Sequence, residues 1–308
     1  MLDDLDSGKD IARHTERLLR EAEALGRFPT PVEDIISAAN LKQDDDPLFA
    51  DSILAKAPAA LAAKVRQLRG RAAAALDRQE RVIYVDDGVD HDGRRRFKQL
   101  HEVTHDILPW QADTAYADTN ASLSWRTRVG FEQEANQGGA ELLFQRTRFE
   151  EIAGEYELGF GAVLDLANRF GASYHAAFRR YVETHRIPMA GVVLERSPCE
   201  ASGTAYRRKE AVNSRSWVRR HEPVCGWPTV LRAVPYSFVD GIKTLGDQPL
   251  RSSLTYADLK NEQSTLQVEM WSNTYNVFVL LWLPRRERLR RRRVVAAGSS
   301  SGPSRSVS

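Results

Sequence analysis

The residues best suited to chemistry are His101, Glu102 and His105, which stand in the sequence His-Glu-Val-Thr-His. If this segment is helical, the two histidines lie one turn apart on one face and can bind a single Zn²⁺ ion. Glu102 can then take a proton from a water molecule at the metal and later give it to a leaving amine. This spacing therefore predicts the core of a zinc peptidase.

The residues around this motif predict an amphipathic helix over residues 94–108. Its apolar positions recur at helical spacing, and the two histidines lie at the edge of the apolar arc. This arc consists of Phe97, Leu100, Thr104, Ile107 and Leu108. The alternative is an ordinary amphipathic helix that happens to carry two histidines.

A catalytic zinc needs a third protein ligand and an open fourth position. Glu132 and Asn136 are four residues apart, so a helix over residues 131–136 would place them on one face. Glu132 is the candidate ligand, and Asn136 is a candidate to hydrogen-bond a ligand from outside the metal shell. Glu134 would point elsewhere and is the reserve ligand. The alternative for this segment is a solvated acidic helix face.

Together the two segments resemble the ImmA/IrrE family of zinc metallopeptidases. The family pattern has an arginine-rich approach to a phenylalanine, then HExxH, then ExxAN, an alanine-rich segment and paired leucines. The resemblance runs through most of residues 10–185 and implies zinc ligands His101, His105 and Glu132, with Glu102 as the catalytic base. The matching residues are Arg94, Arg95, Arg96, Phe97, His101, Glu102, His105, Glu132, Ala135, Asn136, Ala140, Leu142 and Leu143.

Three departures from the family pattern indicate a divergent branch. Thr104 stands where a small residue is usual, and Phe144-Gln145 replaces a frequent Met-Pro. Gly138-Gly139 replaces a usual Phe-Ala, which weakens the helix by roughly 1 kcal/mol per glycine. None of the three removes a ligand, but together they predict a different substrate cleft.

Composition indicates a globular chain of 308 residues, 42% of them hydrophobic. Cys199 and Cys225 are the two cysteines, and we expect free thiols in a reducing cytosol. The acidic N-terminus lacks an apolar segment, and the longest apolar run, residues 277–283, is far short of the roughly 20 residues that span a bilayer. We therefore expect a cytoplasmic protein with no membrane partner.

Charge is distributed unevenly along the chain. Residues 285–308 carry eight arginines and one glutamate, so this tail is +7 and the rest of the chain is −5 within a net charge of +2. The cluster over residues 285–293 could contact nucleic acid or an acidic partner. The Gly/Ser/Pro-rich end favours a solvated, disordered tail instead.

We predict an α+β fold with two domains. Residues 1–188 would form a mainly helical, zincin-like metallopeptidase domain with a short sheet, including a strand over residues 81–85 after an alanine-rich helical stretch over residues 51–80. Residues 189–284 would form a β-rich regulatory or docking domain, because residues 190–195, 265–270 and 276–283 are rich in β-branched and aromatic residues. Residues 285–308 would be the basic disordered tail.

A second interpretation comes from residues 162–184, where two short helices flank a turn at Gly171-Ala172-Ser173. This is the outline of a helix-turn-helix, so a DNA-binding transcriptional regulator is the alternative function. The segment also fits the helical pair that follows ExxAN in the ImmA/IrrE family, and packing of the peptidase core is the preferred interpretation. A structural zinc protein is the third hypothesis.

The resemblance implies a function in regulation. Known substrates of the family are transcriptional repressors, often of the helix-turn-helix class, that are cut in response to stress. We therefore expect a zinc-dependent endopeptidase whose partner is a repressor, in stress response or mobile-element regulation. Direct binding of nucleic acid stays open but is not favoured.

Overall fold

The computed structural model describes residues 7–44, 74–78, 80–85, 91–111, 125–200, 204–221, 227–257 and 263–284. The chain divides into two compact units, one of residues 1–156 and 163–177, the other of residues 157–162 and 178–308. The predicted boundary at residue 188 stays a prediction. The predicted tail over residues 285–308, like Cys225, lies outside the described residues.

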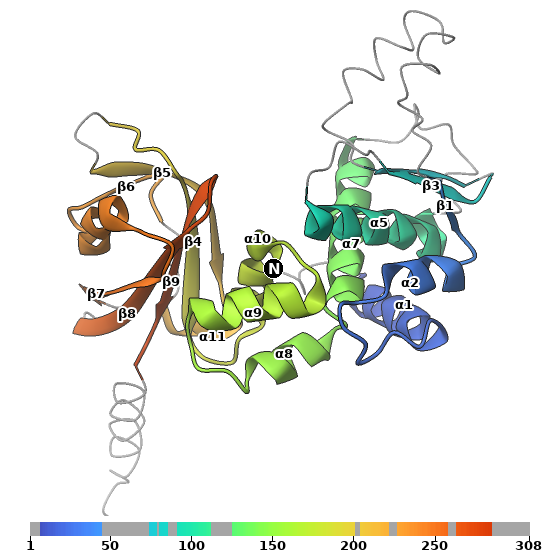
Figure 1. The fold of residues 1–308 in the computed structure, drawn as a ribbon, viewed down its shortest axis with the longest axis horizontal. Coiled ribbons are helices and arrows are strands. Elements are labelled where there is room, and N and C mark those ends of the chain that lie inside the picture. The colour runs from blue at the N-terminus through green and yellow to red at the C-terminus, as the bar shows by residue number, and fades with distance from the viewer. Residues whose placement is uncertain are drawn as a thin grey trace, which may run out of the picture. The chain divides into compact units, whose positions relative to one another are not determined.

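The first unit is mainly helical (Figure 1). Helices α5 and α7 pack against each other, and α1 and α2 contact this pair. Its helices are α1 (Gly8–Glu21), α2 (Val32–Ala38), α5 (Asp92–Ile107), α7 (Trp125–Leu143), α8 (Thr147–Ala153), most of α9 (Phe160–Phe170) and the start of α10 (Tyr174–Thr184). The helices expected for the two motif segments are therefore present.

A small sheet beside α5 has the strand order β1-β3-β2. Strand β3 (Val82–Val85) lies in the centre, parallel to β1 (Lys42–Asp44) and antiparallel to β2 (Ala74–Asp77). The predicted strand over residues 81–85 is confirmed. The predicted helix over residues 51–80 is wrong for residues 74–77, which form strand β2 instead. Pairing of β2 with β3 outweighs the helix preference of the alanines in β2. Residues 51–73 lie outside the described residues.

Glycines on α7 allow it to approach α5 very closely. A Cβ atom at Gly138 would lie 2.2 Å from Cγ2 of Thr104, and one at Gly139 would lie 3.1 Å from the backbone nitrogen of His101. Thr104 is fully buried and its χ1 is restricted by β-branching, so its methyl group has little freedom to move away. Two of the departures from the family pattern, Thr104 and Gly138-Gly139, are thus complementary across one interface.

The second unit is built on a six-stranded sheet with the order β6-β5-β4-β9-β8-β7, antiparallel throughout. Its strands are β4 (Met189–Glu195), β5 (Ala205–Asn213), β6 (Val230–Arg232), β7 (Leu250–Ala257), β8 (Gln263–Ser272) and β9 (Asn276–Trp282), with helix α11 (Arg215–His221) and the 3-10 helix η1 (Ser237–Thr244). The expected strands over residues 190–195, 265–270 and 276–283 coincide with β4, β8 and β9.

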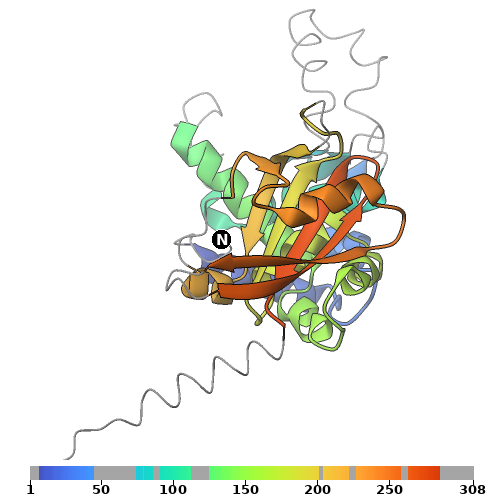
Figure 2. The same cartoon turned by 90° about the vertical axis from the view of Figure 1, so that its left-hand side faces the viewer.

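One hydrophobic cluster of this unit lies on the face of the sheet that η1 covers (Figure 2). Phe238, Val239 and Ile242 of η1 pack with alternate residues of the central strands, including Val192 and Val279. The chain is therefore a mixed α+β protein with a helical first part and a β-rich C-terminal part, as predicted. None of the helices in the described residues combines the length and the apolar character that a membrane span requires.

We expect Gly138→Ala to lower the free energy of unfolding. Alanine gains roughly 1 kcal/mol of helix propensity, but overpacking against Thr104 costs about 1–3 kcal/mol, so the midpoint of urea unfolding should fall. In a Thr104→Ala background the same substitution should raise the midpoint, because the crowding methyl group is gone.

Gly130→Ala provides the matched control in the same helix. A Cβ atom there meets no heavy atom within 4 Å, so only the helix-propensity gain applies. If Gly138→Ala stabilised the protein as much as Gly130→Ala, α7 would be free to move away from α5 and the close approach would not be a constraint.

Candidate metal centre

The α5–α7 interface brings together the three predicted metal ligands. His101 and His105 project from α5 and Glu132 from α7, and their ligand atoms all lie within 4.8 Å of one another. His101 is buried, His105 is partly buried, and the side chain of Glu132 is 63% exposed. The cluster is thus shielded from solvent on the side of α5 and accessible to solvent at Glu132.

The spacing of the ligand atoms fits a tetrahedral zinc ion. Nε2 of His101 and Nε2 of His105 are 3.2 Å apart, and they lie 3.3 and 3.6 Å from the two carboxylate oxygens of Glu132. Ligands about 2.0–2.1 Å from a tetrahedral Zn²⁺ are separated from one another by about 3.3 Å. Two imidazoles and one carboxylate are also a usual donor set for catalytic zinc, so the residues present fit the metal.

Electrostatics favour an ionised Glu132. Its contacts with His101 and then His105 hold the pKa of its carboxyl far below the usual range, despite partial burial. Burial alone would lower the pKa of His105, but its contacts with Glu132 and Glu102 outweigh burial and raise it. The carboxylate is therefore in the anionic form that a cation requires.

The pKa of Glu102 is shifted in the opposite direction from that of Glu132. Burial raises the pKa of its carboxyl, and the nearby His101 and His105 only partly offset this effect. A carboxyl with a raised pKa is a better proton acceptor near neutral pH than an exposed glutamate. Glu102 therefore has the character expected of a general base beside the two histidines.

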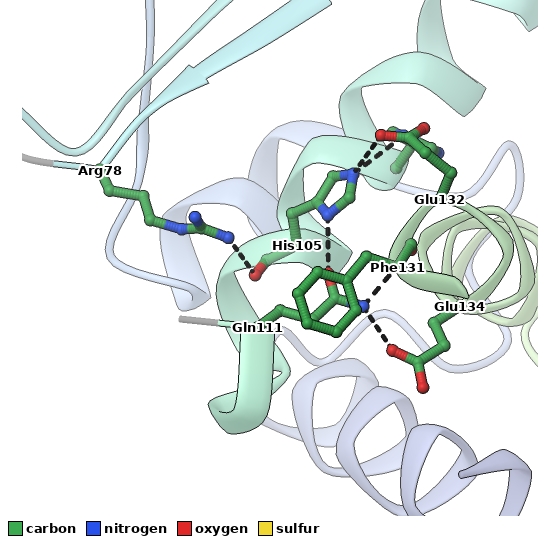
Figure 3. A network of polar contacts seen from close by, with 7 residues as sticks. Arg78, His105, Gln111, Phe131, Glu132 and Glu134 are labelled. Carbon is green, nitrogen blue, oxygen red and sulfur yellow. Dashed lines mark hydrogen bonds and ion pairs between the residues drawn. The ribbon is translucent and has the colours of Figure 1, made fainter. Parts of the chain in front are cut away.

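Outside the ligands, Gln111 hydrogen-bonds the second histidine (Figure 3). Its Oε1 lies 2.7 Å from Nδ1 of His105, and its Nε2 lies 2.6 Å from Oε2 of Glu134. Gln111 is 1% exposed and belongs to a short helical turn after α5. Sequence patterns do not identify Gln111, because no spacing rule connects a glutamine with a histidine six residues earlier.

Three other polar residues of α5 and α7 do not contact the imidazoles in the described residues. Glu134, the reserve ligand, points away from the metal cluster and bonds Gln111 and Trp110 instead. Asn136 is exposed, and within the described residues no hydrogen bond connects it with either histidine, so its role stays a prediction. Asp106 forms an ion pair with Arg81 rather than contacting an imidazole.

The C-terminal end of α5 is fixed by two arginines. Nη2 of Arg78 donates to the backbone carbonyl of His105 at 2.9 Å (Figure 3), and Nη1 of Arg81 lies 2.6 Å from Oδ1 of Asp106. Arg81 also donates to the carbonyl of Ala39 just after α2. Positive charge at a helix C-terminus is favourable, so these contacts stabilise the turn that carries His105.

Comparison with known families agrees with this geometry. Residues 61–181 match the family model Peptidase_M78, the IrrE N-terminal-like domain, and this range includes both motif helices. Over these residues the chain is similar to the IrrE N-terminal-like domain, and the predicted resemblance to ImmA/IrrE proteins is confirmed. This part of the chain is therefore peptidase-like.

The fold is shared with a solved structure, a Mycobacterium tuberculosis transcriptional regulator, at a TM-score of 0.50 and 12% sequence identity. The likeness covers 97% of this chain and 94% of that chain. At this level of identity it shows a common fold alone. No curated protein matched the sequence.

We expect the purified protein to bind about one zinc ion per chain, measured by elemental analysis after dialysis. Glu132→Ala should weaken binding roughly a hundredfold or more, since loss of a direct ligand exceeds the 10–100-fold cost of losing an outer contact. Gln133→Ala is the control, because the neighbouring side chain is also exposed and lies outside the cluster.

Zinc should also raise the melting temperature of the wild type and of Gln133→Ala but not of Glu132→Ala, because a ligand that binds only the folded state stabilises it. Equal zinc content in all three proteins would exclude Glu132 as a ligand.

Proposed function

We propose that this protein is a zinc-dependent endopeptidase that cleaves a protein substrate. The observation that carries the proposal is the convergence of His101, His105 and Glu132 at tetrahedral spacing beside the desolvated Glu102. The match of residues 61–181 to a peptidase family supports the same reaction class.

In this proposal His101, His105 and Glu132 hold the metal, and Asn136 assists from outside the metal shell. Zn²⁺, when bound, would polarise the scissile carbonyl and make water more acidic. The Glu102 carboxylate accepts a proton from the attacking water and later donates it to the leaving amine. Burial raises the pKa of the Glu102 carboxyl, which favours uptake of the proton in the first of these steps.

For the substrate we propose a transcriptional repressor, cut once to relieve repression under stress. The support is the resemblance to ImmA/IrrE proteins, together with the name of the Mycobacterium tuberculosis structure, which is a transcriptional regulator of the same fold. The β-rich unit would then serve as a regulatory or docking domain, and the protein would act in the cytoplasm.

Glu102→Gln should abolish cleavage and retain zinc. The substitution keeps the size of the side chain and removes the base, and general base catalysis typically contributes about 10²–10⁴-fold. The zinc-loaded protein is incubated with the helix-turn-helix repressor encoded nearest its gene, and products are followed by mass spectrometry. Glu155→Gln, the same change at an exposed glutamate, is the control for a contaminating protease.

Undiminished cleavage by Glu102→Gln would exclude this glutamate as the base. A protein that needs zinc to fold and cleaves nothing would instead be a structural zinc protein, the third hypothesis.

The DNA-binding alternative depends on α10 as a recognition helix, and its burial argues against that role. Phe178, Arg180 and Tyr181 are buried. Arg179 is exposed, but it pairs with Glu183 and Glu210, each at 3.0 Å. A recognition helix needs side chains free to reach base edges and phosphates, so these pairings leave little of α10 for DNA.

We therefore expect Glu102→Gln to show only weak binding to duplex DNA in fluorescence anisotropy at low salt, and no change on further substitution of Arg179 by alanine. Tight binding that falls steeply with salt and weakens in the Arg179→Ala variant would favour the DNA-binding regulator.

A further inference from the structure

The strongest feature outside the metal ligands is a chain of hydrogen bonds from Glu134 through Gln111 to His105 (Figure 3). Gln111 makes three contacts through its amide: Oε1 to Nδ1 of His105, Nε2 to Oε2 of Glu134, and Nε2 to the backbone carbonyl of Phe131 at 3.3 Å. Its side chain is almost fully buried, so these protein partners replace water.

The partners of Gln111 decide which way its amide points. The Phe131 carbonyl can only accept hydrogen bonds, and so can an ionised Glu134. The end of the amide that faces both of them must therefore be the NH₂ group, and the oxygen must face His105. The orientation follows from chemistry and does not depend on distinguishing oxygen from nitrogen.

This orientation in turn decides the tautomer of His105. The amide oxygen of Gln111 can only accept, so Nδ1 of His105 must carry the hydrogen that joins them. In a neutral imidazole the other nitrogen, Nε2, then has a free lone pair. Nε2 is the atom that faces His101 and Glu132 in the metal cluster.

Glu134 is itself held in place by donors from two other parts of the first unit. Nε1 of Trp110 donates to its Oε2 at 2.8 Å, and Oγ of Ser7, at the start of α1, donates to its Oε1. A carboxylate with three donors has a fixed position, and it keeps the amide of Gln111 from turning over.

We propose that Glu134 and Gln111 are positioning residues that hold His105 in the Nδ1–H tautomer before any metal arrives. The metal then meets a lone pair on Nε2 and does not have to displace a proton or rotate the ring. The zinc part of this proposal rests on the proposed function, whereas the tautomer part concerns the protein alone. His101 differs, because its buried Nδ1 has no hydrogen-bond partner among the described residues.

The first experiment measures the tautomer in the metal-free wild type. Histidine is labelled with ¹⁵N, and ring-nitrogen shifts are recorded by long-range NMR at a pH where the imidazole is neutral, with His105→Gln to assign the signal. We expect His105 to be the Nδ1–H tautomer. The Nε2–H tautomer would overturn the proposal, whether or not the protein is a peptidase.

The second experiment compares Gln111→Met with Gln145→Met. Both glutamines are 1% exposed, and both have fully bonded amides, Gln145 to Gly26, Arg27 and Thr30. Each variant therefore loses a buried amide of the same size, but Gln111 alone of the two contacts an imidazole of the cluster. Zinc affinity is measured by competition with a chromophoric chelator.

We expect Gln111→Met to bind zinc about 10–100-fold more weakly than the wild type, and to show a mixture of His105 tautomers when metal-free. Gln145→Met should keep the wild-type affinity and tautomer even if it melts at a lower temperature. Equal affinity in Gln111→Met and the wild type, or an equal loss in both variants, would overturn the positioning role.

The two proposals fail in different ways. If the wild type binds zinc but cleaves nothing, the peptidase function fails and the zinc comparison still tests the role of Gln111. If the wild type binds no zinc, the tautomer measurement alone decides the inference.

Discussion

The close approach of α7 to α5 is the constraint on which the rest of the candidate metal centre depends. Residues of α5 supply both imidazoles, whereas the carboxylate comes from α7, so the distance between the two helices sets the distance between these groups. Where the helices touch, Gly139 lies against the backbone of His101, and Gly138 lies against Thr104. Moving the two helices apart would lengthen the distances from Glu132 to both imidazoles, and a shared ion has to bridge these distances.

The site is also supported from outside this interface. The carbonyl of His105 accepts from Arg78, which directly follows β2, and Asp106 pairs with Arg81, which directly precedes β3. On the other side, Gln111 joins the ring of His105 to Glu134. The second histidine is therefore held at its backbone by the sheet region and at its ring by Gln111, which is itself held by α7, so the protein alone fixes its orientation.

Much of this arrangement could be predicted from sequence, because the spacing of residues within each motif determines which side chains share one face of a helix. Four-residue spacing on a helix places two imidazoles together, and the family pattern names Glu132 as their partner. The small strand β2 was missed because its alanines favour a helix, and pairing with β3 is not visible in local sequence. Gln111 was missed for a similar reason: its contacts depend on how the turn after α5 folds back onto α7, which no periodicity records.

The complementary pair Thr104 and Gly138 has a consequence for how this branch could have arisen. The family pattern places a small residue at the position of Thr104 and a phenylalanine at the position of Gly138. In this chain the larger side chain of the pair is therefore on α5, whereas in the family pattern it is on α7. A chain that gained the threonine first would have had to fit it against a large side chain where even a Cβ atom is too close. A chain that lost the large side chain first would have carried only a cavity, which costs stability but leaves the backbone in place. The order in which the glycine precedes the threonine is therefore the less disruptive one for the α5–α7 interface.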